Sequence, residues 1–167
     1  INNKFKIKNL TINSSILIGS SQFKKNNLIS EKFIEINELI DLKNHKIKAS
    51  YANKKLSIEG KGQIKLQNIF EIINYKIINN DSDLNLVSNI ELSELDIKIQ
   101  NLIKKYLPKT KDILDLKDHK IRASYANKKL KIEGKGQVKL QNKFEFIDYK
   151  VAQSGSDLNL VSNIDLS

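Results

Sequence analysis

The feature that most constrains this chain is an internal repeat with a period of 74 residues. The stretch 41–93 returns as 115–167, and 40 of the 53 aligned positions are identical. A fixed period of this length is typical of a chain built from similar structural units stacked side by side. It also argues against a unique active site, because any catalytic group inside the repeat would be supplied twice.

The repeat also predicts how the chain is divided. Weaker matches at the same shift extend upstream, where Leu84 and Leu86 correspond to Leu10 and Ile12. We therefore expect three parts in one continuous array. Residues 1–40 are the tail of a preceding unit with its connector, residues 41–114 are a full unit, and residues 115–167 are a second, truncated unit. The chain does not begin with Met, and we interpret it as a segment of a longer protein.

Composition narrows the class of protein without identifying a function. The 167 residues are 40% hydrophobic, which is sufficient for a sizeable core. No cysteine is present, so disulfides and thiolate chemistry are excluded. The net charge of +10 is typical of proteins that bind nucleic acid or anionic lipid. However, Arg122 is the only arginine, and Lys, Ile and Asn are abundant, a mixture that AT-rich codons produce. We therefore favour the interpretation that the charge reflects base composition and that the lysines form a solvated strand face.

The start of each unit predicts a β-hairpin. Apolar and polar side chains alternate from His45 to Ala52, and Asn53-Lys54 is suited to a two-residue turn. This turn would pair Tyr51 with Leu56, Ala49 with Ile58 and Ile47 with Gly60. A one-residue slip would move the apolar set to the other face, so the register is self-consistent.

The second strand of the unit, residues 55–66, carries Gly60 and Gly62 on the apolar face. Glycine inside a strand marks a bulge, a bend or a close approach, and here we expect it to let the sheet curl. A three-residue turn at 67–69 would pair Leu66 with Phe70, Ile64 with Ile72, and Lys65 with Glu71 on the outer face.

Further strands are expected at residues 4–12, 15–23 and 84–92, with short helices at 27–36 and 101–107. A strand over 33–36 is the alternative to the first of these helices. The predicted fold class is therefore mainly β. It is an antiparallel meander of tandem 74-residue repeats, curled into a groove or an open barrel, with short connecting helices.

Candidate catalytic and ligand-binding motifs are weak. The stretch Glu59-Gly-Lys-Gly-Gln63 lies within a strand, whereas a phosphate-binding loop requires a strand-to-helix turn. His45 and His119 are equivalent copies, and we expect both to be solvated at the start of a strand. The recurring Tyr51, Tyr75, Tyr125 and Tyr149 are suited to core packing or to stacking on bases. We expect no enzyme activity, no metal and no cofactor.

The pattern resembles the AsmA-like family of bacterial envelope proteins, in particular its TamB and YhdP branches. The residues that carry the resemblance are Leu130-Lys-Ile-Glu-Gly-Lys-Gly-Gln-Val-Lys-Leu140, Leu158-Asn-Leu-Val-Ser-Asn-Ile-Asp-Leu166 and the connector Tyr106-Leu-Pro108. The resemblance implies a long curled sheet whose apolar groove passes phospholipid between the inner and outer membranes. It also implies a periplasmic location in the cell envelope, with an inner-membrane anchor in parts of the protein outside this chain.

On that resemblance, phospholipid is the expected partner and nucleic acid is not. The side chains that alternation and cross-strand pairing place on one face would line the groove. They are Ile47, Tyr51, Leu56, Ile58, Ile64, Leu66, Phe70, Ile72, Leu84, Leu86, Ile90 and Leu92, with their counterparts Ile121, Tyr125, Leu130, Ile132, Val138, Leu140, Phe144, Phe146, Leu158, Leu160, Ile164 and Leu166.

Two alternatives from other classes stay open at this point. The array is also typical of a structural or adhesive surface protein, in which neighbouring repeats are often nearly identical and act as spacers. Less favoured is a basic nucleic-acid-binding protein. The same apolar face could also close over a dry core.

Overall fold

The chain folds into one sheet of nine strands, seen in a computed structural model that describes residues 11–24, 38–80, 83–98, 113–140, 142–155 and 157–165. No helix lies within these ranges. The strands are β1 (Thr11–Lys24), β2 (Leu39–Ala52), β3 (Lys55–Lys65), β4 (Phe70–Asn80), β5 (Asp83–Lys98), β6 (Ile113–Ala126), β7 (Lys129–Leu140), β8 (Lys143–Ser154) and β9 (Asp157–Asp165).

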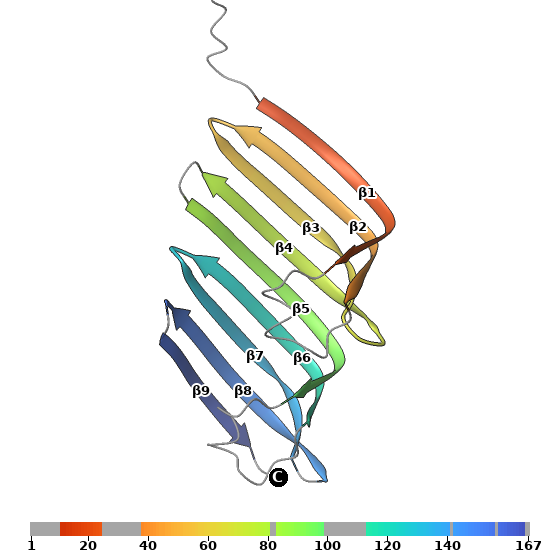
Figure 1. The fold of residues 1–167 in the computed structure, drawn as a ribbon, viewed down its shortest axis with the longest axis vertical. Helices are drawn as coiled ribbons and strands as arrows, with labels where there is room; N and C mark the ends of the chain where they lie inside the picture. The colour runs from red at the N-terminus through yellow and green to blue at the C-terminus, as the bar shows by residue number, and fades with distance from the viewer. Residues whose placement is uncertain are drawn as a thin grey trace, which may run out of the picture.

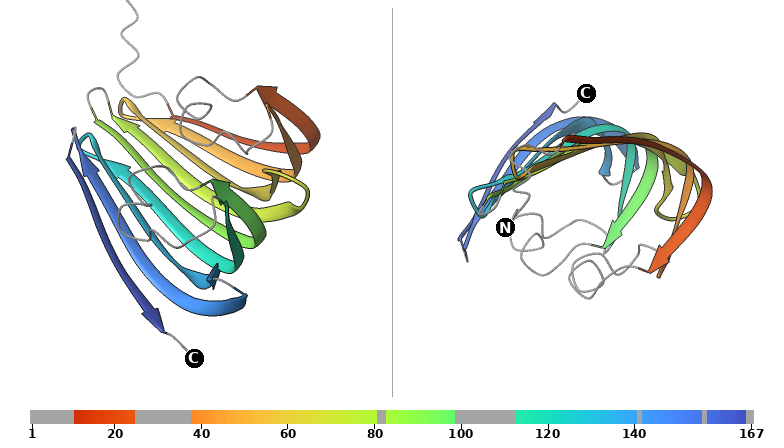
Figure 2. Two further views of the ribbon diagram at one scale, coloured as in Figure 1. Left: turned by 60° about the horizontal axis from the view of Figure 1, so that its bottom comes forward. Right: turned by 90° about the horizontal axis from the view of Figure 1, so that it is seen from above.

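Every strand pairs antiparallel with the next strand in sequence, so the sheet is a simple meander from β1 to β9 (Figure 1). The first and last strands form the two edges, and the sheet stays open. Seen from above it is curled like a trough (Figure 2). The predicted fold class is confirmed in its strand content, antiparallel order and curl. The helices predicted at 27–36 and 101–107, and the first strand from residue 4 to 10, lie outside the described residues.

Each copy of the repeat contributes four strands, β2 to β5 and β6 to β9. Strand β1 is the counterpart of β5 at the same shift of 74 residues, and it is one strand where the sequence predicted two. Its pairing with β2 repeats the pairing of β5 with β6: Ile16 lies opposite Ile47, and Ile90 opposite Ile121. The units therefore join through the same strand contact.

The hairpin predicted at the start of each unit is confirmed. Tyr51 pairs with Leu56, Ala49 with Ile58, and the second unit repeats this register. Asn53 and Lys54 have φ of 49° and 61°, the two positive values that a type I′ turn requires. This turn matches the right-handed twist of the strands, which is why it holds the register.

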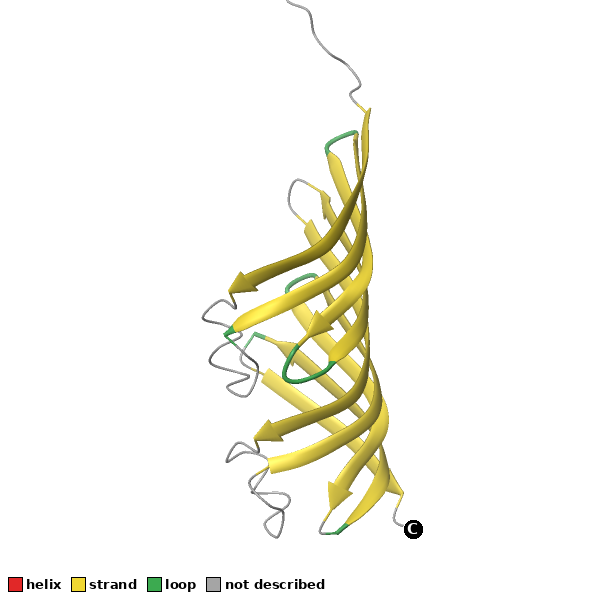
Figure 3. Ribbon diagram, turned by 90° about the vertical axis from the view of Figure 1, so that its right-hand side faces the viewer, coloured by secondary structure: helices red, strands yellow, loops and turns green. Residues whose placement is uncertain are grey.

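A β-bulge interrupts the second and sixth strands at the same place in each unit. The register shifts between Lys43 and Lys46, and again between Lys117 and Lys120. The residue after the first lysine is Asn44 in one copy and Asp118 in the other, with φ of 54° and 53°. A bulge bends its strand and resets the side-chain alternation. The sheet bends accordingly toward one side (Figure 3).

Because of the bulge, Leu42 and His45 lie on the same face although they are three positions apart. Leu42 pairs with Ile64, and the His45 ring lies over Gly62, two residues earlier on the same strand. The apolar side chains before and after the bulge therefore lie on the same side of the sheet.

The neighbouring strand adapts to the bend through a buried carboxylate. Glu71, at the start of β4, accepts hydrogen bonds from the backbone N–H and hydroxyl of Ser93 at 2.9 and 3.1 Å, and from the N–H of Glu94 at 3.4 Å. Both residues belong to β5 at the point where it bends. The paired register of β4 and β5 ends at Ile72 and Glu91, so these charge-assisted bonds connect the two strands beyond the end of their ladder. The counterpart Glu145 is also buried.

The predicted register between β3 and β4 is wrong by one residue. Lys65 pairs with Phe70 and Ile64 with Glu71, so four residues, 66–69, separate the paired strands where three were predicted to. A slip of one residue moves every side chain of a strand to the other face. The slip is the same in the second unit, where Val138 pairs with Glu145 and Lys139 with Phe144. It places Glu71 and Tyr75 on the apolar face, where each has a specific contact.

The core of the sheet lies on the apolar face near the bend. Leu92, Leu95, Leu116 and Val138 form its buried cluster, and Ile90, Ile121 and Ile147 are among the apolar residues packed against it. These side chains come from β5, β6, β7 and β8, so the cluster joins the end of the first unit to the second.

We expect Glu71→Ala to lower the free energy of unfolding by about 3 kcal/mol, because the N–H groups of Ser93 and Glu94 lose their charged acceptor. Glu71→Gln should cost less, since one acceptor oxygen remains. Urea unfolding measures both. The exposed Glu91→Ala is the control and should change stability by less than about 0.5 kcal/mol. Equal costs for all three would show that the bend does not depend on the carboxylate.

Candidate functional site

The structure places most of the predicted groove residues on a single face, called here the apolar face. Cross-strand pairs connect them across the sheet in the order in which the strands lie. The members are Ile47, Tyr51, Leu56, Ile58, Ile64, Leu66, Leu84, Leu86, Ile90 and Leu92 in the first unit, and Ile121, Tyr125, Leu130, Ile132, Val138, Leu140, Leu160 and Ile164 in the second. Leu166 and the side chain of Leu158 lie outside what the structure describes.

Four predicted groove residues lie on the opposite face because of the register slip in β4 and β8. They are Phe70, Ile72, Phe144 and Phe146. Phe146 is 63% exposed, and Ile72 is 41% exposed. The Phe70 ring lies between the ammonium groups of Lys43 and Lys65, at 5.5 and 5.9 Å from its centroid. Cation–π attraction thus holds on the polar side a ring that hydrophobicity alone assigns to the core.

The in-strand glycines serve a close approach of aromatic rings. A Cβ on Gly60 would collide with the ring of Tyr75, and one on Gly62 with the ring of His45. Gly134 stands in the same relation to Tyr149. Each ring covers backbone that a side chain would otherwise cover, so these glycines mark a close approach. The sequence showed the glycines but not their partners, since the rings come from neighbouring strands.

The two histidines are the largest fully buried side chains among the described residues, at 2% and 1% exposure, so the expectation that they are solvated is wrong. Alternation from Ile47 places His45 on the apolar face, and the same alternation from Ile121 places His119 there. Each ring lies over an in-strand glycine, Gly62 or Gly136, which accounts for its burial. His45 Nε2 lies 2.8 Å from the carbonyl oxygen of Gln63, and His119 Nε2 lies at the same distance from that of Gln137. A carbonyl only accepts, so Nε2 carries the proton and donates it.

The second unit extends this contact to a tyrosine. With Nε2 protonated, Nδ1 of His119 accepts from the hydroxyl of Tyr149 at 3.5 Å, and the two ring centroids are 5.8 Å apart. Burial raises the pKa of Tyr149 to about 12. Burial also lowers the pKa of His119 below its ordinary value, although the Gln137 carbonyl and the Asp118 carboxylate favour the protonated ring. Both groups are therefore neutral near pH 7 and suit a packing role.

Exposure on the apolar face changes from one margin of the sheet to the other. Near the bend, Ile40, Leu92 and Val138 are buried. Near the hairpin turns the face is open: Ile12 is 52% exposed and Leu84 47% exposed. The opposite face also exposes apolar side chains, with Leu17 at 70% and Val161 at 60%, but these pair with Lys46 and Lys150. The exposed members of the apolar face pair with uncharged residues, as Ile12 does with Tyr51, which suits a surface that contacts an apolar ligand.

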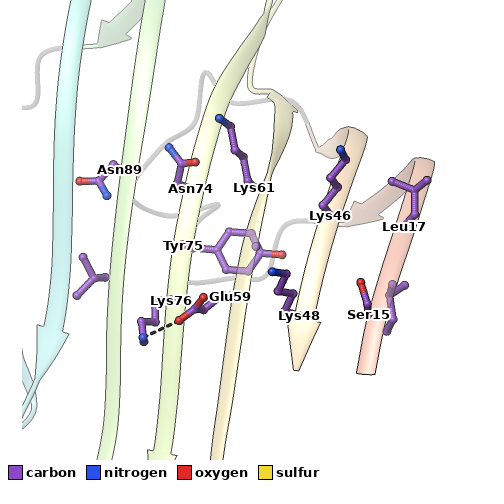
Figure 4. A pocket seen from close by; sticks show the side chains of 13 residues that line it. Ser15, Leu17, Lys46, Lys48, Glu59, Lys61, Asn74, Tyr75, Lys76 and Asn89 are labelled. Atoms are coloured by element: carbon purple, nitrogen blue, oxygen red, sulfur yellow. Dashed lines mark hydrogen bonds and ion pairs between the residues drawn. The ribbon is translucent and has the colours of Figure 1, made fainter. Parts of the chain in front are cut away.

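The opposite face is rich in lysine and holds a shallow depression of about 630 Å³ in the first unit (Figure 4). Lys46 and Lys61 face each other directly across β2 and β3. Lys76 forms an ion pair with Glu59 at 2.6 Å beside them. Both groups of this pair are about half exposed, so the pair contributes little to stability.

Comparisons of the chain with protein-family models, with curated proteins and with solved structures found no match. Among the described residues, no three His, Cys, Asp or Glu side chains come together as metal ligands would. None of the described segments forms a helix with the length and hydropathy needed to cross a bilayer.

The buried His119 should make stability depend on pH. Its pKa is lower when folded, so the unfolded chain binds the proton more readily below about pH 6.5, and stability is lost as pH falls below that value. Urea unfolding between pH 5 and pH 8 measures this. In His119→Asn the slope should be smaller at a lower overall stability. An unchanged slope would mean that the ring does not titrate on unfolding.

Alanine at Gly136 should destabilise the fold by about 1–3 kcal/mol, because its Cβ would overlap the ring and backbone of His119. Gly19→Ala is the matched control within a strand, since a Cβ there meets nothing within 4 Å. Thermal unfolding compares the two variants. Equal melting temperatures would contradict a close-approach role for Gly136.

Proposed function

We propose that this chain is a non-enzymatic segment of a lipid-conducting β-groove of the AsmA-like kind, located in the bacterial cell envelope. In this proposal it shelters phospholipid acyl chains during transport between the inner and outer membranes. The membrane anchor belongs to parts of the protein outside this chain. The single observation that supports the proposal best is the open apolar face, which runs across all nine strands of an unclosed sheet.

The physical argument concerns exposed area. A finished single-layer sheet would need a second layer to cover its apolar side, because exposing large apolar patches to water is costly. Ile12, Ile16, Leu84 and Leu160 are each about half exposed on this face. Acyl chains would cover these side chains without requiring hydrogen bonds, and the lysine-rich face would stay in water.

The test is site-specific photo-crosslinking in cells and in purified protein. Crosslinkers replacing Ile12, Ile58 or Leu84 on the apolar face should capture phospholipid. Those replacing Lys61 or Lys135, which are exposed on the other face, should not. Circular dichroism confirms that each variant keeps its strands. If neither set captures lipid in folded protein, the groove function is wrong for this segment and the spacer alternative is favoured.

A further inference from the structure

Strand β1 forms one edge of the sheet, because among the described residues it pairs with β2 and with no other strand. An edge strand presents backbone N–H and C=O groups with which a further strand can pair. Apolar side chains accompany them: Ile12 and Ile16 are 52% and 50% exposed on the apolar face, and Leu17 is 70% exposed on the other. The edge therefore has both the hydrogen-bonding groups and the apolar side chains that strand pairing uses.

The composition of β1 suits pairing with another strand. Natural proteins protect edge strands with charged residues or proline. Residues 11–23 contain neither, although 29% of the chain is charged. The counterpart β5 lies inside the sheet and carries Glu91 and Glu94, where β1 has Leu17 and Ser20 at the same shift of 74 residues. Charge is thus missing from the edge, where it would prevent association, and present in the interior strand.

The other edge strand, β9, differs in this respect. It begins with Asp157 and ends with Asp165. If β9 paired antiparallel with β9 of a second copy over its full length, these carboxylates would lie opposite each other at both ends, and like charges in directly opposite positions are destabilising. A second copy of β1 brings no such conflict. In a chain with a net charge of +10, β1 is an uncharged margin at which two copies can approach.

We propose that β1 binds β1 of a second copy of this chain, antiparallel and about a two-fold axis at Ser14. In this register Ile12 lies opposite Ile16 of the second copy, and Asn13 opposite Ser15, each twice. Cross-strand pairs of β-branched residues stabilise a sheet. Because Ile12 and Ile16 both belong to the apolar face, the apolar faces of the two copies lie on the same side of the joined sheet. The inference goes beyond the proposed function and does not depend on lipid binding.

The geometry of β1 limits the contact to its straight part. Strand β1 bends as β5 does (Figure 1), and the equivalent of Ser93 at the bend is Gly19. The proposed register uses residues 11–17, which precede it. Such a contact is isologous, so it occupies the β1 edge of both copies and ends at a dimer of two nine-stranded sheets. Pairing of β1 with β9 of another copy would instead be head-to-tail and would continue into longer assemblies.

The test is sedimentation velocity of the whole chain over a wide range of concentration, which should show a monomer–dimer equilibrium. The variant N13E/S15E sets glutamate opposite glutamate twice at the proposed contact, and should raise the dissociation constant of the dimer at least about tenfold. Within one copy, position 15 faces Lys48, so the melting temperature of the monomer should be unchanged.

The matched control is N159E/V161E, which adds the same charge to the other edge strand, where position 161 faces Lys150. This variant should dimerise like the wild type. Equal loss of the dimer in the control would overturn the inference in favour of a general charge effect.

A second measurement tests the register. The chain has no cysteine, so S14C provides a single thiol. Directly opposite residues in an antiparallel pair have Cα atoms close enough for a disulfide, so mild oxidation should give a covalent dimer of S14C and none of N159C on β9. A wild type that stays monomeric, assemblies larger than a dimer, or an unchanged dimer in N13E/S15E would each overturn the inference.

Discussion

The shape of this sheet depends on the bulge that precedes each buried histidine. Without it, strict alternation would send Leu42 and His45 to opposite faces, and the apolar side would change over at the bend. With it, the His45 ring covers Gly62 and its Nε2 donates to the Gln63 carbonyl, which holds the bent backbone of two strands together. The carboxylate of Glu71 performs the equivalent role one strand pair further along. Two polar side chains, an imidazole and a carboxylate, therefore support the bend of an otherwise apolar face.

The parts of the fold that were predictable are those determined by neighbours in sequence. The 74-residue period and the turn residues Asn53-Lys54 were sufficient to predict the meander and the register of the first hairpin. Both features depend on the alternation of side chains along a strand and on the residue types in the turn. The β3–β4 register was not predictable in this way. Placing Phe70 opposite Leu66 follows from hydrophobicity, whereas the structure buries Glu71 against Ser93 and places the ammonium groups of Lys43 and Lys65 over the Phe70 ring.

The candidate site shows the same division. Its apolar members on β2, β3, β5, β6 and β7 followed from alternation, because no competing contact acts on them. Alternation also assigns His45 and His119 to this face, but their burial was not predictable, since the rings pack over glycines of the next strand. The bulge decides instead that Leu42 shares the face of His45, and its sequence signal is Asn44 or Asp118, residue types that tolerate positive φ. The glycines were visible in the sequence, yet their ring partners lie on other strands and could be identified only in three dimensions.

The equivalence of β1 and β5 has a consequence for how such a chain changes length. Because β1 pairs with β2 in the register by which β5 pairs with β6, removing one 74-residue period would bring β1 against β6 in that same register. An additional 74-residue unit would likewise pair with its neighbours in the same strand register. Recombination between two similar stretches of the coding sequence would therefore give longer or shorter sheets whose strands pair in an unchanged register. The sheet would therefore lengthen or shorten in steps of four strands, the number that each unit contributes.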